Sequence, residues 1–222
     1  MFKKKFKIAP SLLSANFTKL KDEILNVEAA GADLLHLDVM DGHFVPNLTI
    51  GPFIIEAIRE CTKLPLDVHL MIEAPEKYIE AFIKAGGDMI SFHCEAPTAS
   101  PEIVAQIKKM GAKAGIAINP HTNISKLNDY FDVVDFVLVM SVYPGFGGQK
   151  FIDETLEKIK KLEKYRETHN HAFEIEVDGG INGANVSDLA KAGVDIFVAG
   201  SAIFKTADYR QTIAQMREKL NG

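Results

Sequence analysis

The stretch Leu34-Leu35-His36-Leu37-Asp38-Val39-Met40-Asp41-Gly42 limits the fold more than any other part of the chain. Apolar residues alternate with polar ones, which is typical of a β-strand because successive side chains point to opposite faces. Leu35, Leu37 and Val39 belong on a face that packs against helices. His36 and Asp38 are then left on the inner face, at the carboxyl end of the strand, where α/β barrels carry their functional residues.

The same pattern recurs along the 222 residues. The predicted strands are 7–13, 34–40, 66–71, 89–94, 113–118, 136–140, 173–177 and 196–199, and helical patterns include 18–30, 75–85, 101–110, 153–168 and 208–220. Strands that alternate with helices pair in parallel through right-handed crossovers. Because Gly-x-Gly-x-x-Gly does not follow the first strand, an open dinucleotide-binding sheet is disfavoured. We expect an α/β protein, one (β/α)8 TIM barrel with residues 1–222 as its catalytic domain.

Composition narrows the class of function. The chain is 47% hydrophobic, which excludes a disordered protein, and its net charge of −5 argues against a nucleic-acid partner. The apolar runs are too short for a membrane span. Met1–Lys7 holds four lysines but leads into Ile8-Ala9-Pro10, so we expect no signal peptide. The two cysteines, Cys61 and Cys94, suit reduced thiols, and we expect a cytoplasmic protein.

Ionisable residues at three strand ends predict a metal site. By the alternation of side chains, His69 shares the inner face of strand 66–71, and Asp178 ends the run Glu176-Val177-Asp178. Together with His36 and Asp38 they offer two imidazoles and two carboxylates, and burying such groups without a cation would be costly. One divalent ion is expected, and zinc, iron(II), manganese and cobalt all accept these ligands.

Three glycine-rich turns follow the last strands and predict a phosphate site. They are Pro144-Gly145-Phe146-Gly147-Gly148-Gln149, Asp178-Gly179-Gly180-Ile181-Asn182 and Ala199-Gly200-Ser201-Ala202. Barrels commonly bind phosphate with the loops after strands seven and eight, where glycine lets backbone N–H groups approach the anion. One such turn alone is a weak indication, but three together favour a phosphate cradle.

A metal, two carboxylates and a phosphate grip suit an epimerisation. A metal beside neighbouring oxygens of a ketose would acidify the adjacent C–H and stabilise an enediolate. If Asp38 and Asp178 act from opposite faces, one removes the proton and the other returns one, which inverts the carbon. Met40, Met71 and Met140 end inner strand faces, where packing at the mouth is favoured over contact with the planar intermediate.

Longer motifs then suggest a family. They are Ala9–Ala15 (A-P-S-L-L-S-A), His36–Asn47 (H-L-D-V-M-D-G-H-F-V-P-N), Val68–Met71 (V-H-L-M), Ser91–Glu95 (S-F-H-C-E), Met140–Gln149 (M-S-V-Y-P-G-F-G-G-Q) and Ala199–Phe204 (A-G-S-A-I-F). Nearly end to end, the chain resembles the ribulose-phosphate 3-epimerase family of the pentose phosphate pathway and Calvin cycle. The resemblance implies interconversion of D-ribulose 5-phosphate and D-xylulose 5-phosphate by a homo-oligomer, a dimer or hexamer.

The resemblance also implies residue roles. His36, Asp38, His69 and Asp178 would bind the metal, with Asp38 as proton acceptor and Asp178 as proton donor in one direction. The implied substrate contacts are Ser11, His69, Gly145, Phe146, Gly147, Gly148, Asp178, Gly179, Gly180, Gly200 and Ser201. For His93, Glu95 and Glu176 we expect supporting hydrogen bonds around the site.

Three alternatives stay open. A D-allulose 6-phosphate 3-epimerase would use the same chemistry on a longer sugar. A lyase or decarboxylase with Asp-x-Lys-x-x-Asp is disfavoured, because the strand from His36 to Asp41 has no lysine. A phosphate-binding module without catalysis would be indifferent to the loss of Asp178.

Overall fold

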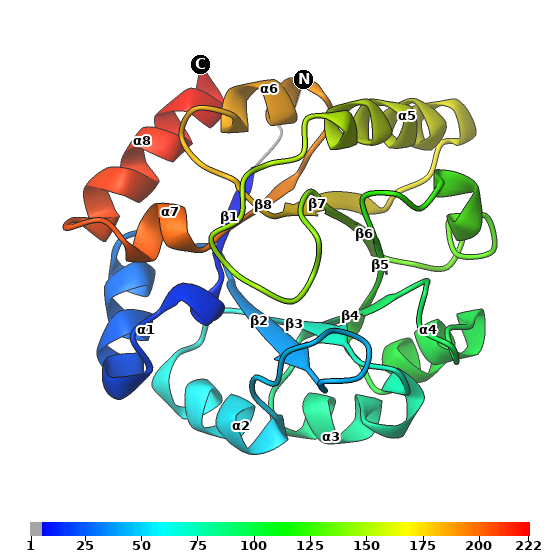
Figure 1. Cartoon of the computed structure of the whole chain (residues 1–222), viewed down its shortest axis with the longest axis horizontal. Helices are drawn as coiled ribbons and strands as arrows, with labels where there is room; N and C mark the ends of the chain where they lie inside the picture. The colour runs from blue at the N-terminus through cyan, green and yellow to red at the C-terminus, as the bar shows by residue number, and fades with distance from the viewer. Residues whose placement is uncertain (1–5) are drawn as a thin grey trace.

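The computed structural model describes residues 6–222, which form a barrel of parallel strands surrounded by helices (Figure 1). The lysines at positions 3–5 lie outside the described residues. The strands are β1 Lys7–Pro10, β2 Leu35–Met40, β3 Leu66–Met71, β4 Met89–His93, β5 Lys113–Ile118, β6 Phe136–Met140, β7 Glu174–Asp178 and β8 Ile196–Ala199. The predicted TIM-barrel fold is therefore confirmed.

Helices follow most strands and cover the outside of the barrel (Figure 1). The α-helices are α1 Leu20–Ala29, α2 Pro52–Cys61, α3 Ile79–Lys84, α4 Pro101–Lys109, α5 Glu154–His169, α6 Val186–Lys191, α7 Ser201–Phe204 and α8 Tyr209–Asn221. Short 3-10 helices occupy Leu12–Ser14, Phe17–Lys19, Pro75–Lys77 and Ile124–Leu127, the last of which replaces an α-helix between β5 and β6. In the described residues, no helix is long and apolar enough to cross a membrane.

Strand pairing brings the first and last strands together. Each strand pairs in parallel with its neighbour from β2 through β8, and β8 pairs with β1. A parallel bridge between Ser11 and His36 closes the remaining junction, between β1 and β2. On the outside, Arg217 of α8 donates to the backbone oxygens of Phe6 and Gly31. The first and last β/α units are thus held side by side.

The two faces of each strand pack into different layers. Leu35, Leu37 and Val39 belong to the large apolar layer between strands and helices, as the alternation predicts. Inside the barrel, a separate cluster with Phe136 at its centre fills the amino end of the strands. Met40 and Met71 pack near the carboxyl end. The inward orientation predicted for alternate residues of β2 is therefore confirmed.

Four aspartates tie neighbouring strands together in pairs at the amino end of the barrel. Asp33, Asp88, Asp135 and Asp195 each precede an even-numbered strand, and each carboxylate accepts a backbone N–H from the preceding odd-numbered strand at 2.8 Å. Each also forms an ion pair, with Arg217, Arg59, Lys108 and Arg166 respectively. We call these four groups the aspartate clamps. They lie at the end of the barrel opposite the site described below.

The structure corrects some predicted boundaries. The first strand ends at Pro10 rather than at residue 13, because the backbone turns into the 3-10 helix Leu12–Ser14. The segment 89–94 loses its last residue, and strand seven is shifted by one residue, to Glu174–Asp178. The helix Pro52–Cys61 was not among the named patterns. Its buried residues Ile55 and Ile58 stand three positions apart, which is helical spacing, so the sequence did carry the signal for this helix.

Candidate active site

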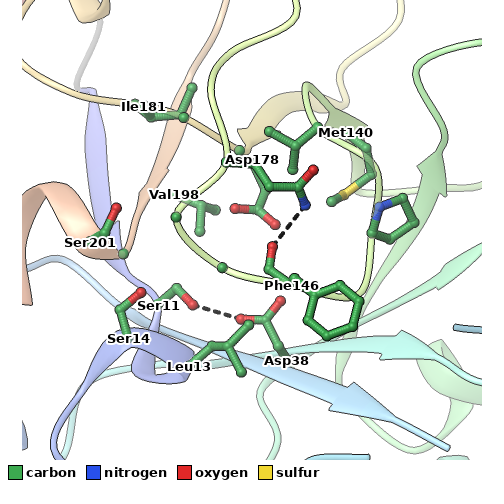
Figure 2. Close-up of a pocket in the computed structure, with 18 of the residues that line it drawn as sticks. Ser11, Leu13, Ser14, Asp38, Met140, Phe146, Asp178, Ile181, Val198 and Ser201 are labelled. Carbon is green, nitrogen blue, oxygen red and sulfur yellow. Dashed lines mark hydrogen bonds between the residues drawn. The ribbon is translucent and has the colours of Figure 1, made fainter. Parts of the chain in front are cut away.

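A cavity of about 430 Å³ opens at the carboxyl end of the strands. Asp38 and Asp178 enter it from opposite sides of the barrel, and Figure 2 shows them facing each other across the pocket. The loop between β6 and α5 crosses the mouth of the barrel (Figure 1) and brings Gly145–Gly148 to the cavity. Of the residues predicted to contact substrate, all but His69 line this cavity.

The four predicted metal ligands converge beneath the cavity. His36, Asp38, His69 and Asp178 each offer an atom within 4.8 Å of the others. Asp38 Oδ1 lies 3.6 Å from His36 Nε2 and 3.7 Å from His69 Nδ1. Two ligands about 2.1 Å from a tetrahedral ion lie roughly 3.4 Å apart, close to both separations. This arrangement has the geometry of a metal site.

Unpaired ring nitrogens support the same conclusion. His36 and His69 are fully buried, and neither His36 Nε2 nor His69 Nδ1 has a hydrogen-bond partner among residues 6–222. A buried polar atom without a partner is costly, and these two atoms point toward the same carboxylate. A divalent ion would satisfy both nitrogens, so the residues present fit a metal.

The opposite ring nitrogens do have partners. His36 Nδ1 lies 2.6 Å from Asp67 Oδ2, and His69 Nε2 lies 2.9 Å from His93 Nε2. His93 Nδ1 in turn lies 3.2 Å from Glu95 Oε2. Supporting contacts were expected of His93, Glu95 and Glu176, but Asp67 was missed. The alternation that placed His69 on the inner face also places Asp67 there, two residues earlier, and would have found it.

Burial and neighbouring charges give the two carboxylic acids of the site different pKa values. Burial opposes ionisation of Asp38, but the positive charge of His36, with His69 also close by, outweighs it and holds the pKa of Asp38 well below its ordinary value. Burial, together with the negative charge of Asp38, raises the pKa of Asp178 to about 7. Although burial disfavours its charge, Asp67 and Asp38 raise the pKa of His36. Before any ion binds, Asp38 is therefore a carboxylate and Asp178 is close to its titration midpoint at neutral pH.

Glycines allow close backbone approach on the far side of the cavity. Gly180 has φ of +68°, and a Cβ there would lie 2.3 Å from Phe151 N. At Gly200 a Cβ would lie 2.6 Å from Ser14 Oγ. All three predicted glycine turns thus line the cavity, and Gly147 and Gly200 both approach Ser14, near Ser201 at the start of α7.

Comparison with known proteins shows the family to which the chain belongs. The model of the ribulose-phosphate 3-epimerase family matches residues 7–204, so the chain belongs to this family. It is accordingly an epimerase, and thus an isomerase. The chain is 50% identical over 212 residues to a ribulose-phosphate 3-epimerase of Bacillus subtilis, covering 95% of this chain and 98% of the relative. It is 44% identical over 218 residues to that of Escherichia coli K12, covering 98% and 97%.

Solved structures of lower identity share the fold. A 3-hexulose-6-phosphate synthase from Salmonella typhimurium superposes with a TM-score of 0.71 at 19% identity, covering 96% of this chain and 98% of the other. A KGPDC from Streptococcus mutans superposes with a TM-score of 0.70 at 13% identity, covering 97% of each chain. At these identities the likeness supports the barrel alone.

Proposed function

We propose that the protein interconverts D-ribulose 5-phosphate and D-xylulose 5-phosphate with one divalent metal ion. The observation that carries the proposal is the placement of Asp38 and Asp178 on opposite sides of one cavity, above two unpaired imidazole nitrogens. Inversion at a carbon needs an acid and a base on opposite faces of the substrate. Family membership is consistent with this reaction.

We propose a part for each residue on the basis of this geometry. A divalent ion held by His36, Asp38, His69 and Asp178 would supply positive charge beside the ketose oxygens, which acidifies the neighbouring C–H. Asp38, as the carboxylate, removes that proton, and Asp178 delivers one to the opposite face of the enediolate. In the reverse direction the two residues exchange roles. Met40, Met71 and Met140 line the same cavity and would help to exclude water from the planar intermediate.

The phosphate group is proposed to bind at the glycine end of the cavity. Gly147, Gly148, Gly180, Gly200 and Ser201 lie there, with the side chain of Lys205 nearby. Exposed backbone N–H groups would bind the anion, and this end of the cavity would fix the direction in which the sugar lies. Ser11, Gly145, Phe146 and Gly179 would contact the rest of the substrate. His69 is fully buried and does not line the cavity, so its ligand role has more structural support than its substrate contact.

Metal analysis combined with turnover tests the proposal. The purified protein should contain about one divalent ion per chain, as the set of four ligands within residues 6–222 implies. Chelation should abolish epimerisation of ribulose 5-phosphate, and a divalent ion should restore it. Full activity in a verified metal-free sample would contradict metal dependence. The same assay with D-allulose 6-phosphate tests the alternative, and a preference for the hexulose would overturn the choice of substrate.

Other expectations stay predictions. We propose that residues 1–222 act as one catalytic domain, that the protein is a cytoplasmic homo-oligomer, and that it needs neither nucleic acid nor membrane. The metal is one of zinc, iron(II), manganese or cobalt, since two imidazoles and two carboxylates suit each of them.

A further inference from the structure

His36 lies between the candidate metal site and two buried acidic residues, Asp67 of β3 and Glu176 of β7. His36 and Asp67 are directly paired in the register of β2 with β3, and all three side chains are fully buried. Asp67 Oδ2 lies 2.6 Å from His36 Nδ1, and Glu176 Oε1 lies 3.5 Å from the same nitrogen. The catalytic roles proposed above leave both acidic residues without a part.

The contact with His36 accounts for the presence of Asp67 in the barrel interior. An aspartate without exposure to water is costly unless its charge is matched by a partner. The second oxygen, Oδ1, has no hydrogen-bond partner within residues 6–222, so packing or backbone support does not explain the residue. The short contact of its Oδ2 with the Nδ1–H of His36 does explain it.

We propose that Asp67 is a positioning residue that fixes which nitrogen of His36 faces the metal. A neutral imidazole has one N–H and one lone pair, and either nitrogen can bind a metal. Because the Asp67 carboxylate accepts the proton of Nδ1, the lone pair is confined to Nε2, 3.6 Å from Asp38 Oδ1. The negative charge also makes the imidazole a stronger electron donor to the ion. This inference rests on the proposed metal binding.

The same geometry argues against a second cation between His36, Asp67 and Glu176, although their ligand atoms lie within 4.8 Å of one another. Two ligands about 2.1 Å from one ion stay roughly 3 Å or more apart. The 2.6 Å separation of His36 Nδ1 and Asp67 Oδ2 is that of a hydrogen bond. A proton therefore joins them, and the chain binds one ion rather than two.

Zinc affinity tests the role directly. The full-length protein, Asp67→Asn and Asp195→Asn would each be stripped of metal and titrated with Zn²⁺ against a chromogenic chelator. Asn keeps the shape of Asp but loses the charge, so affinity should fall about tenfold to a hundredfold. Asp195 is an aspartate clamp at the opposite end of the barrel and receives the same substitution, so its variant should stay within about threefold of the wild type. Thermal unfolding of each metal-free variant checks that the barrel is intact.

Nitrogen-15 NMR of the zinc-loaded wild type gives a second reading that does not depend on any variant folding. His36 should show a protonated Nδ1, whose proton resonates far downfield, with zinc on Nε2. In Asp67→Asn that proton should move upfield. Zinc on Nδ1 of His36, two zinc ions per chain, or equal affinity in Asp67→Asn would each overturn the positioning role. A wild type that binds no divalent ion would contradict both this inference and the proposed metal dependence.

Discussion

The hydroxyl of Ser11 donates a hydrogen bond to Asp38 Oδ2 at 2.6 Å, and both residues are buried at the mouth of the barrel (Figure 2). Ser11 follows β1, whereas Asp38 belongs to β2, so this bond spans the junction that the Ser11–His36 bridge closes. It occupies one oxygen of Asp38 and leaves Oδ1 facing the two histidines. The proposed proton acceptor is therefore oriented by a neighbouring strand.

Replacing Ser11 tests this orientation. In Ser11→Ala the Asp38 carboxylate loses a hydrogen bond to a charged group, worth about 1.5–3 kcal/mol. We expect kcat to fall about tenfold to a hundredfold, since 1.4 kcal/mol corresponds to a factor of ten in rate. Steady-state kinetics of epimerisation, with metal content measured in parallel, checks this. Unchanged kcat at full metal occupancy would show that the bond does not orient Asp38.

The two carboxylates should be distinguishable by isotope exchange. Asp38→Asn and Asp178→Asn each remove one of two acid/base groups, and we expect epimerisation to fall by about a factor of 10² to 10⁴ or more. Each variant keeps the group on one face, so it should still exchange the substrate C–H with D₂O for one epimer only, and the two variants should prefer opposite epimers. Proton NMR in D₂O follows this exchange, with metal content determined for each variant. Exchange of the same epimer by both variants would contradict the two-face assignment.

Gly180 should not tolerate a side chain. Its φ of +68° and the 2.3 Å that would separate an added Cβ from Phe151 N mean that Ala would strain the turn and displace backbone. We expect Gly180→Ala to lose at least about 1–2 kcal/mol of unfolding free energy and to raise KM for the sugar phosphate. Gly183→Ala is the matched control, since its Cβ would meet nothing closer than Lys219 Nζ at 3.8 Å. Denaturant unfolding and kinetics compare the two variants, and equal behaviour would rule out a tight turn at Gly180.

The aspartate clamps should affect stability without affecting catalysis. Asp195 accepts from Ile175 N at 2.8 Å and pairs with Arg166 at 2.6 Å, at the amino end of the barrel. Asp195→Asn weakens both contacts, so we expect a loss of about 1–3 kcal/mol of unfolding free energy. For a domain of this size, each kcal/mol lowers Tm by about 2–4 °C. Calorimetry measures the shift, while kcat should match the wild type. A lowered kcat with unchanged Tm would reverse this assignment.

The two cysteines should differ in reactivity. Burial, with the negative charge of Glu95 nearby, raises the pKa of the Cys94 thiol well above its ordinary value. The Cys94 thiol therefore stays protonated at pH 8. Because the thiolate is the reactive form, a further rise in pH within the range where the protein is stable should not make Cys94 reactive. Cys61 is only half-buried. A disulfide exchange reagent should therefore modify about one thiol per native chain and both after unfolding. Labelling of the native Cys61→Ser variant as rapid as that of the wild type would be the contrary result.

The sequence predicts the barrel well because two periods govern it, the two-residue period of strands and the 3.6-residue period of helices. Alternating side chains placed His36, Asp38 and His69 on inner faces, and the same rule extends to Asp67 although that residue was overlooked. The 3-10 turn after Pro10 could not be read from the sequence, because it depends on Ser11 pairing with strands distant in the chain. The tautomers of His36 and His69 could not be predicted from the sequence either. They depend on partners, Asp67 and His93, whose distances only the folded barrel defines.

The aspartate clamps have a consequence for how such a protein can change over time. They repeat on alternate strands at the amino end, whereas the residues that face the cavity lie at the carboxyl end. Because most substitutions destabilise a protein, a sequence can acquire new chemistry only if some other part keeps it folded. With the two tasks at opposite ends, mutations that reshape the cavity leave the clamps intact. Selection can then act on substrate specificity and on thermal stability almost independently.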